Sequence, residues 1–330
     1  MIARIGWIIG AVLLIVGLLL AGGVDPAAAA TKLVQSSLGT PRAIAGTLEQ
    51  TTPLLIAAVG VFIALRAGLF NIGIEGQFLV GALAATQLAL AFPTGAGAVA
   101  ALLGGGIAGA AWAWPAGAIR AYRNGHEVIS TIMLNSVALA LTDYLVAGPL
   151  RDPAKGTAAT FDLDPAARLP QLWAGPGYGI SASLILAVVL VIATHLWRIR
   201  RVAGYELDLV GANPTAAPQM GVRVAPVQVV AMMASGAIGG LAGAVQVLAF
   251  EGRFYQGISP GYGFDALGIA LLAGPSTLVL IPVSLLFGAL AKGSVALQLI
   301  GVTKGFVTVI AGIFILIAAI VRVRREATHD

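Results

Sequence analysis

The chain has 330 residues, of which 58% are hydrophobic and only 10% are charged, and its mean hydropathy is +0.95. A soluble fold is excluded because so few charged residues cannot cover the surface of a chain this long. The net charge of +5 does not require nucleic acid as a partner, since basic residues that flank membrane helices explain it. Without cysteine, disulfides, thiolate metal sites and cysteine nucleophiles are excluded.

Apolar runs near the roughly 20 residues that cross a bilayer recur along the chain. Unbroken runs select helices, so the expected fold class is all-α, with one polytopic integral membrane domain over residues 1–330. The first run is longer than a signal-peptide core, and we expect it to be retained. The ten predicted transmembrane or half-membrane segments are residues 5–22, 52–66, 72–92, 97–119, 128–148, 179–197, 227–250, 262–274, 277–291 and 305–321.

Basic residues set the expected orientation. Arginine clusters lie at 120–123, 198–201 and 322–325, and Lys and Arg are enriched on the cytoplasmic side of membrane proteins. An even number of crossings puts all three clusters and both termini there. The segment at about 149–178 is then an external loop, expected to be an ordered surface with a short helix. It acts either as a tether or as a docking surface for an external partner. The segment at about 198–226 is a cytoplasmic loop.

Glycines lie at helical spacing inside the apolar segments. The pairs Gly236 and Gly240, and Gly239 and Gly243, are each four residues apart within one predicted span. Small residues at this spacing let helix backbones approach closely. They therefore predict helix packing and not a ligand site.

The first polar segment within the apolar sequence is 66–77, which contains Asn71 and Glu75 among three glycines. An ionisable residue at membrane depth marks a solute path or a buried network, and the glycines permit a broken helix. The alternative is that Glu75 pairs with Arg66 at the cytoplasmic interface.

The second polar segment opens the predicted span 128–148. Ser130, Thr131 and Asn135 lie near one face of that helix. Such hydroxyl and amide groups either join neighbouring helices or line a path. Asp143 lies further along the same face, near the expected outer mouth.

A third segment, 261–274, is too short to cross a bilayer and predicts a half helix. Its aromatic residues Tyr262 and Phe264 either stack on a solute ring or mark the membrane interface. Asp265 is expected to cap the helix that follows.

The fourth segment, 204–221, lies in the cytoplasmic loop. Asn213 is expected to cap about two turns of helix that begin at Pro214 and end at Gly221. This helix would present small Ala216 and Ala217 beside Met220. It has the character of a docking helix for a cytosolic partner.

Taken together, Gly68 to Gln77, Glu127 to Asn135, Gly204 to Gly221 and Gly261 to Gly274 resemble, in the same order, the diagnostic stretches of bacterial nucleoside-type ABC transporter permeases. These permeases group with the simple-sugar and branched-chain amino-acid permeases, and the resemblance covers the chain from about residue 50. It implies a type II-like ABC importer permease in the bacterial cytoplasmic (inner) membrane.

The resemblance also implies partners: two cytoplasmic ABC ATPase subunits, a second permease that is the same or paralogous, and an extracytoplasmic solute-binding lipoprotein. The permease itself is then non-catalytic and takes no cofactor, which agrees with the lack of a Gly-x-x-x-x-Gly-Lys-Ser/Thr loop. The residues that match the ATPase-coupling element are Gly211, Asn213, Pro214, Ala216, Ala217 and Gly221. The residues expected along the solute path are Asn71, Glu75, Asn135 and Phe264.

Two residues depart from the pattern. Pro218 lies inside the coupling element and is expected to kink it, because proline donates no backbone N–H. Asp208 falls where many such permeases carry a basic residue, which implies a differently charged ATPase-facing surface.

Three alternative functions remain open. A simple-sugar ABC permease would share every motif. An ion-coupled secondary transporter also uses broken helices and buried polar residues, but it needs no ATPase-docking segment. A membrane enzyme would need a nucleophile or a metal cluster, whereas His126, His195 and His329 are far apart in the sequence.

Overall fold

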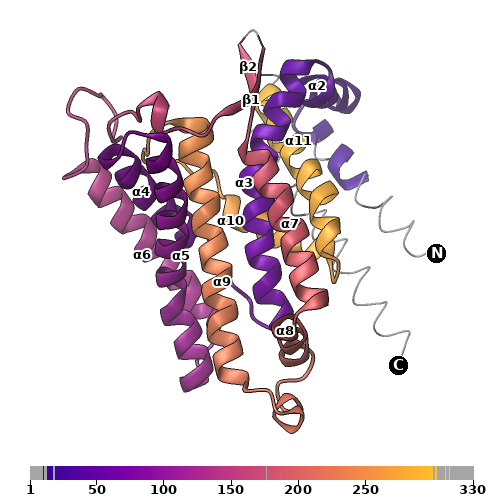
Figure 1. Cartoon of the computed structure of the whole chain (residues 1–330). Coiled ribbons are helices and arrows are strands. Elements are labelled where there is room, and N and C mark those ends of the chain that lie inside the picture. The colour runs from indigo at the N-terminus through magenta and orange to yellow at the C-terminus, as the bar shows by residue number, and fades with distance from the viewer. Residues whose placement is uncertain are drawn as a thin grey trace.

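The computed structural model describes residues 19–175 and 177–299, together with a few isolated positions nearer the two ends. Seven of its helices are long and apolar enough to cross a membrane (Figure 1). The described helices are α2 (Pro26–Leu38), α3 (Pro41–Arg66), α4 (Ile74–Ala91), α5 (Gly95–Arg123), α6 (Glu127–Ala147), α7 (Ser183–Arg200), α8 (Val202–Ala212), α9 (Val224–Val245), α10 (Tyr262–Ala273) and α11 (Leu280–Gln298). Short 3-10 helices are η1 (Pro165–Ala167), η2 (Ala217–Met220) and η4 (Thr277–Val279), and η3 (Gln246–Glu251) is a π-helix that continues α9.

Seven predicted spans correspond to the long helices α3, α4, α5, α6, α7, α9 and α11, and the predicted half helix is α10. Three boundaries differ. The helix α7 begins at Ser183 and not at residue 179. The helix α3 begins at Pro41 because the Thr40 hydroxyl accepts the N–H of Ala43 (3.1 Å) and caps it. The helix α11 continues to Gln298. Of the predicted span 5–22, residues 13–17 and 19–21 are described and helical, whereas the predicted span 305–321 falls almost wholly outside the described residues.

Two elements on the same side of the bundle were not predicted. The helix α2 begins at Pro26, where the Asp25 carboxylate accepts two backbone N–H groups of the first turn. The strands β1 (Gln171–Gly175) and β2 (Tyr178–Ser181) form an antiparallel hairpin, a small exception to the all-α expectation. The hairpin occupies the end of the predicted external loop, and η1 supplies the short helix expected there.

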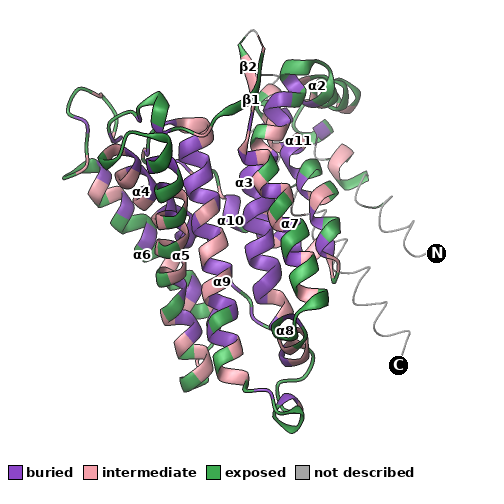
Figure 2. Ribbon diagram, viewed as in Figure 1, coloured by how far each residue is buried: buried purple, intermediate pink, exposed green. Residues whose placement is uncertain are grey.

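The core is held together where small residues let helices touch. The helix α3 is buried along most of its length (Figure 2). The α9 backbone at Gly236 and Gly240 lies against the α5 backbone at Gly109, and Gly243 lies against the carbonyl of Phe78 in α4. The prediction that these glycines serve packing is confirmed.

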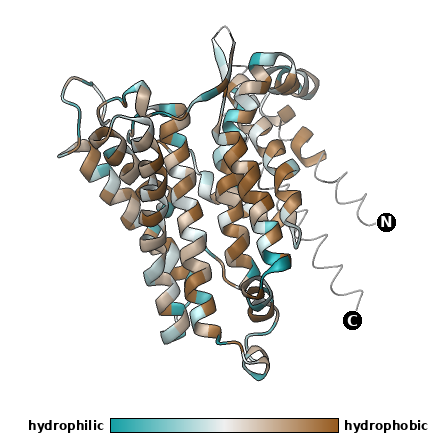
Figure 3. Cartoon of the chain, in the orientation of Figure 1, coloured by the Kyte–Doolittle hydropathy of each residue, from teal (hydrophilic) through white to brown (hydrophobic). Residues whose placement is uncertain are grey.

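The two ends of the bundle differ. One end carries α8 and η2 and is called the α8 end; the other carries α2 and the hairpin and is called the hairpin end (Figure 1). The outward faces of α6 and α7 expose large apolar residues such as Met133, Val137 and Val189. Figure 3 shows mostly hydrophobic helices with hydrophilic residues gathered in the end loops. This pattern is that of a membrane protein surrounded by lipid.

Candidate functional site

The helix break between α3 and α4 is fixed by Asn71, which is fully buried. Its Nδ2 donates to Gln77 Oε1 and to Ser235 Oγ, each at 2.8 Å, and its Oδ1 accepts from Gln77 Nε2 at 3.1 Å. A buried amide is stable only when its donors and acceptors are paired. Asn71 therefore holds the non-helical segment 67–73 against α9.

Asn135 of α6 reaches the same break from another side. Its Nδ2 donates to the Ile72 carbonyl and its Oδ1 accepts the Gly76 N–H, both at 2.8 Å. The first N–H groups of a helix have no partner within the helix, so Asn135 caps α4 from a neighbouring helix. Asn135 therefore joins neighbouring helices, which is one of the two roles expected from the sequence. A Cβ atom at position 76 would lie 2.9 Å from the Asn135 Oδ1.

Glu75 links the start of α4 to the start of α10. Its Oε2 accepts the Gly263 N–H at 2.7 Å. The alternative pairing with Arg66 is wrong, because the Arg66 guanidinium donates to Asp208 at 2.7 Å. Glu75 thus belongs to the buried network and not to the interface.

The helix α10 has 12 residues, which at 1.5 Å per residue is about 18 Å and too short to cross the bilayer. The half-helix prediction is confirmed. The N-cap residue is Gly261, and the hydroxyl of Ser259, two residues before it, accepts the N–H groups of Gly261 and Tyr262 at 3.2 Å. The prediction that Asp265 caps this helix is wrong, because Asp265 lies inside its first turn. Phe264 is 54% exposed.

Three of the four predicted solute-path residues therefore meet at one place. Asn71 and Asn135 bond to the start of α4 or to the chain just before it, and Glu75 belongs to the first turn of α4, whereas Phe264 stands on an exposed face of α10. A role of these residues in solute passage stays a prediction.

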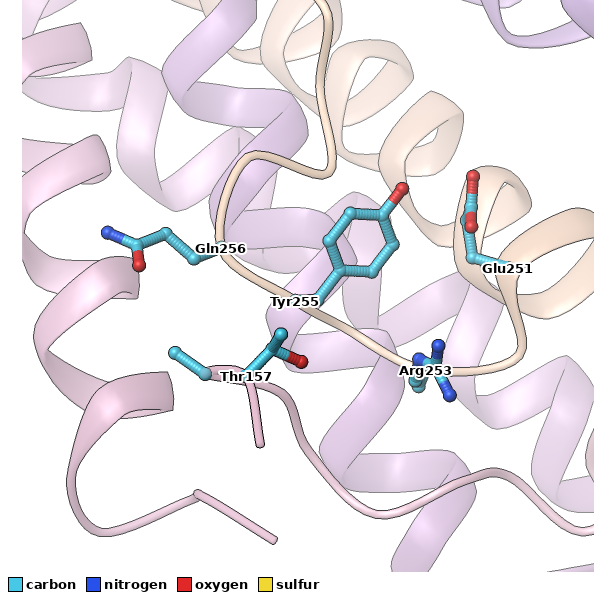
Figure 4. Close-up of a pocket in the computed structure, with 6 residues that line it drawn as sticks. Thr157, Glu251, Arg253, Tyr255 and Gln256 are labelled. Carbon is cyan, nitrogen blue, oxygen red and sulfur yellow. The ribbon is translucent and has the colours of Figure 1, made fainter. Parts of the chain in front are cut away.

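An outer cavity of about 520 Å³ opens at the hairpin end (Figure 4). Thr157 of the external loop forms one wall, and Arg253, Tyr255 and Gln256 of the loop after η3 form another. The two loops run side by side, since the Gln256 N–H donates to the Ala158 carbonyl.

Ion pairs fix the same two loops. Asp162 accepts from Lys155 Nζ at 2.8 Å and from Arg253 at 3.2 Å. The hydrogen bond from Lys155 holds the pKa of the Asp162 carboxyl below its usual range, and the hydrogen bond from Arg253 lowers this pKa by a smaller amount. Asp143, expected near the outer mouth, accepts from Gln256 at 3.1 Å.

An inner cavity of about 390 Å³ lies between α3, η3, α10 and α11. Sequence reasoning singled out Tyr262 and Asp265 of its wall but missed Gln50, Gln246 and Glu251. The Tyr262 hydroxyl donates to Gln50 Oε1 at 2.7 Å, and Gln246 Nε2 donates to Glu251 Oε1 at 3.1 Å. The sequence signal that could have revealed this polar wall is Gln246 near the end of an apolar span, followed five residues later by Glu251.

At the α8 end, α8 packs on the end of α3. Asp208 lies between Arg66 (2.7 Å) and Arg198 (3.7 Å). Asp208 thus pairs with two arginines of its own chain while its side chain stays 32% exposed, and its effect on the charge of a partner-facing surface stays a prediction. The backbone of Gly211 touches that of Arg66 and Gly68.

Beyond α8, residues 213–221 form what we call the α8-end projection. Asn213 Oδ1 accepts the N–H groups of Thr215 (3.0 Å) and Ala216 (3.1 Å), and Gly221 ends the segment at φ +80°. The predicted stop at Gly221 is confirmed, whereas Asn213 closes a turn and does not cap a helix, since the N-cap position of η2 is Ala216. The predicted two helical turns are wrong, because only the 3-10 helix η2 forms. Pro218 has no N–H with which to continue α-helical bonding.

Exposure within the projection also differs from expectation. Ala217 is fully buried and packs with Val210 and Val222, so it anchors the projection and is not presented on its surface. Met220 is 65% exposed, and Asn213 and Pro214 are also exposed.

Residues 43–319 match the family model described as the permease component of the branched-chain amino acid transport system. This match covers most of the chain. The chain belongs to this permease family. Among the described residues, the permease has seven long apolar helices and an exposed projection at one end.

Three similar proteins have names that state a transported solute. The permease is 34% identical to the glucose ABC transporter permease protein TsgB13 of Haloferax volcanii, over 90% of this chain and 81% of that protein. It is 33% identical to the guanosine ABC transporter permease protein NupP of Bacillus subtilis, over 92% and 88%. It is 28% identical to the nucleoside ABC transporter permease protein NupB of Lactococcus lactis, over 96% and 88%. No solved structure matches the permease.

Proposed function

We propose that this permease imports nucleoside-like solutes by alternating access, driven by ATP hydrolysis on partner subunits. The relatives named for guanosine and for nucleosides, each aligned over more than nine-tenths of the chain, support the solute class. Passage needs contacts weak enough for release. We therefore expect a solute path in which few side chains bind the solute strongly.

The observation that carries the ATP-driven mechanism is the α8-end projection. Its exposed tip is joined to the bundle by α8, and α8 contacts the chain just before the α4 helix break through Gly211 and Gly68. A partner that closes on the tip would thus act on the backbone that leads to Glu75. An ion-coupled carrier has no use for such a projection.

The proposed assembly has two cytoplasmic ATPase subunits at the α8 end, a second permease and an external solute-binding lipoprotein. The hairpin end then faces outward, where the ordered external loop offers a docking surface. The catalytic step belongs to the ATPase, and this chain supplies no catalytic residue.

Charge supports this orientation. Among the described residues, the α8 end carries seven arginines and three acidic residues, namely Arg66, Arg120, Arg123, Arg198, Arg200, Arg201 and Arg223 against Glu127, Glu206 and Asp208. In the external loop 149–178 the basic and acidic residues cancel. Such an excess of arginine is typical of the cytoplasmic side.

Single introduced cysteines test the orientation by thiol labelling. Because the natural chain contains no cysteine, only the introduced residue of this chain can be labelled. Gly156→Cys in the external loop meets no atom within 4 Å, and Gln219→Cys lies on the exposed projection. In intact cells, a membrane-impermeant maleimide should label Gly156→Cys only, and Gln219→Cys should react after lysis. Labelling of Gln219→Cys in intact cells would reverse the orientation.

A second candidate solute is a simple sugar, because the relative from Haloferax volcanii is named for glucose. Labelled guanosine and labelled glucose should be compared in cells that express the permease with its neighbouring ATPase and binding protein. We expect saturable guanosine uptake that excess glucose does not inhibit. Uptake of glucose alone would keep the transporter class and replace the solute.

A further inference from the structure

The outer and inner cavities share two wall residues. Glu251 and Tyr255 line both cavities. Figure 4 shows the Tyr255 ring with its hydroxyl on the same side as Glu251. Glu251 and Tyr255 therefore lie at the boundary between the outer and the inner cavity.

The π-helix η3 explains how Glu251 is positioned. In a π-helix, residues five apart lie one above the other, and Gln246 and Glu251 have this spacing. Gln246 Nε2 donates to Glu251 Oε1 at 3.1 Å, while Gly252 leaves the helix at φ +67°. Local π-helical turns are frequent at functional sites. Here the turn places a carboxylate and an amide side by side on the cavity wall.

The chemistry of the inner cavity favours an uncharged solute with hydroxyl groups. Its wall carries the carboxylates of Glu251 and Asp265, and none of the described residues that line it is basic. Such a wall repels phosphate and carboxylate groups and attracts hydrogen-bond donors. A nucleotide would be excluded, whereas a nucleoside or a sugar would be accepted.

Hydrogen-bonding capacity remains free in this cavity. A carboxylate has about four acceptor positions, and Glu251 uses one for Gln246. Gln246 is only 5% exposed. Its buried amide oxygen has no hydrogen-bond partner among the described residues. The side-chain oxygen of Gln50 accepts a hydrogen bond from the Tyr262 hydroxyl. The NH₂ group of Gln50 is then available to donate to a solute. The volume of about 390 Å³ is within the usual range for small-molecule sites.

We propose that the inner cavity binds the vicinal hydroxyl groups of the solute ring, with Glu251 accepting from two adjacent hydroxyls and Gln50 donating to one. Gln246 holds the carboxylate in place. This inference rests on the proposed function, because it names the part of a nucleoside or sugar that the permease recognises.

The test compares ring hydroxyls directly. Proteoliposomes that contain the complete transporter are assayed for uptake of labelled guanosine with unlabelled guanosine or 2′,3′-dideoxyguanosine as competitor. The wild type should prefer the ribonucleoside by at least about tenfold, because the dideoxynucleoside lacks both hydroxyls and the loss of a single hydrogen bond to a charged group already accounts for about that factor. Glu251→Gln should raise KM for guanosine and abolish the preference, and Glu251→Asp should restore part of it.

Asp143→Asn is the matched control, because it neutralises another carboxylate of the hairpin end that lines neither cavity. It should leave the preference unchanged. Glu251→Gln uptake with the wild-type preference and KM would overturn the inference while leaving the proposed function intact. Absence of both guanosine and glucose uptake in the wild type would instead overturn the proposed function.

Discussion

Replacing Gly211 with valine is expected to stop solute uptake while leaving the membrane-spanning bundle folded. A Cβ atom at position 211 would overlap the Arg66 carbonyl oxygen and lie 3.0 Å from the Gly68 nitrogen. Because backbone atoms cannot move aside as side chains do, α8 must shift away from the end of α3. The Arg66–Asp208 ion pair would be strained by the same shift. We expect uptake to fall at least about tenfold, equivalent to ~1.4 kcal/mol.

The readouts for Gly211→Val separate coupling from folding. Uptake and ATP hydrolysis are measured together in proteoliposomes, and size-exclusion chromatography reports whether the permease is folded. Hydrolysis should persist without stimulation by the loaded binding protein. Ala203→Val adds the same side chain at an exposed position of α8 and should remain coupled. Normal uptake by Gly211→Val would show that the α8–α3 contact does not transmit ATPase movement.

Gly240→Val is expected to prevent assembly of the bundle itself. Position 240 lies where α9 crosses α5, and an added Cβ would overlap the Gly105 carbonyl oxygen and lie 2.9 Å from the Gly109 Cα. Overpacking of a close-packed core costs about 1–3 kcal/mol when side chains absorb it. Here the contact is backbone against backbone, so we expect a larger loss and little folded protein.

Gly106→Ala is the control for Gly240→Val, because its added methyl group meets only the Ala237 carbonyl oxygen, at 3.4 Å. Alanine also favours the helix by up to about 1 kcal/mol, so this variant should be at least as stable as the wild type. Thermal unfolding in detergent measures both. A Gly240→Val midpoint equal to that of the wild type would contradict the packing assignment.

Much of the fold follows from hydropathy alone, because a bilayer forces each long apolar run to become a helix. The missed elements are those that lipid does not dictate. The helix α2 depends on the Asp25 cap and on packing against α11, where Leu33 lies against Gly293. The β1–β2 hairpin is set by local pairing in a polar loop. Neither leaves a hydrophobic pattern of membrane length.

The residues of the candidate site were only partly predictable. Asn71, Glu75 and Asn135 stood out as polar residues within apolar sequence, yet their partners come from other helices and could not be read from spacing. Gln50 and Glu251 approach each other only when α3 and η3 pack, across about 200 residues of chain. Pro218 allowed the disruption of the coupling element to be foreseen, but the burial of Ala217 depends on Val210 and Val222.

ATP-driven accumulation of guanosine is the most direct test of the proposed function. The purified permease is reconstituted with its ATPase and binding protein, and uptake of labelled guanosine is followed with ATP, with a non-hydrolysable analogue, and with a permease that lacks residues 211–221. We predict saturable accumulation that requires hydrolysable ATP and is lost with the deletion. Uptake driven by an ion gradient, with no ATPase present, would contradict the assignment as an ATP-coupled permease.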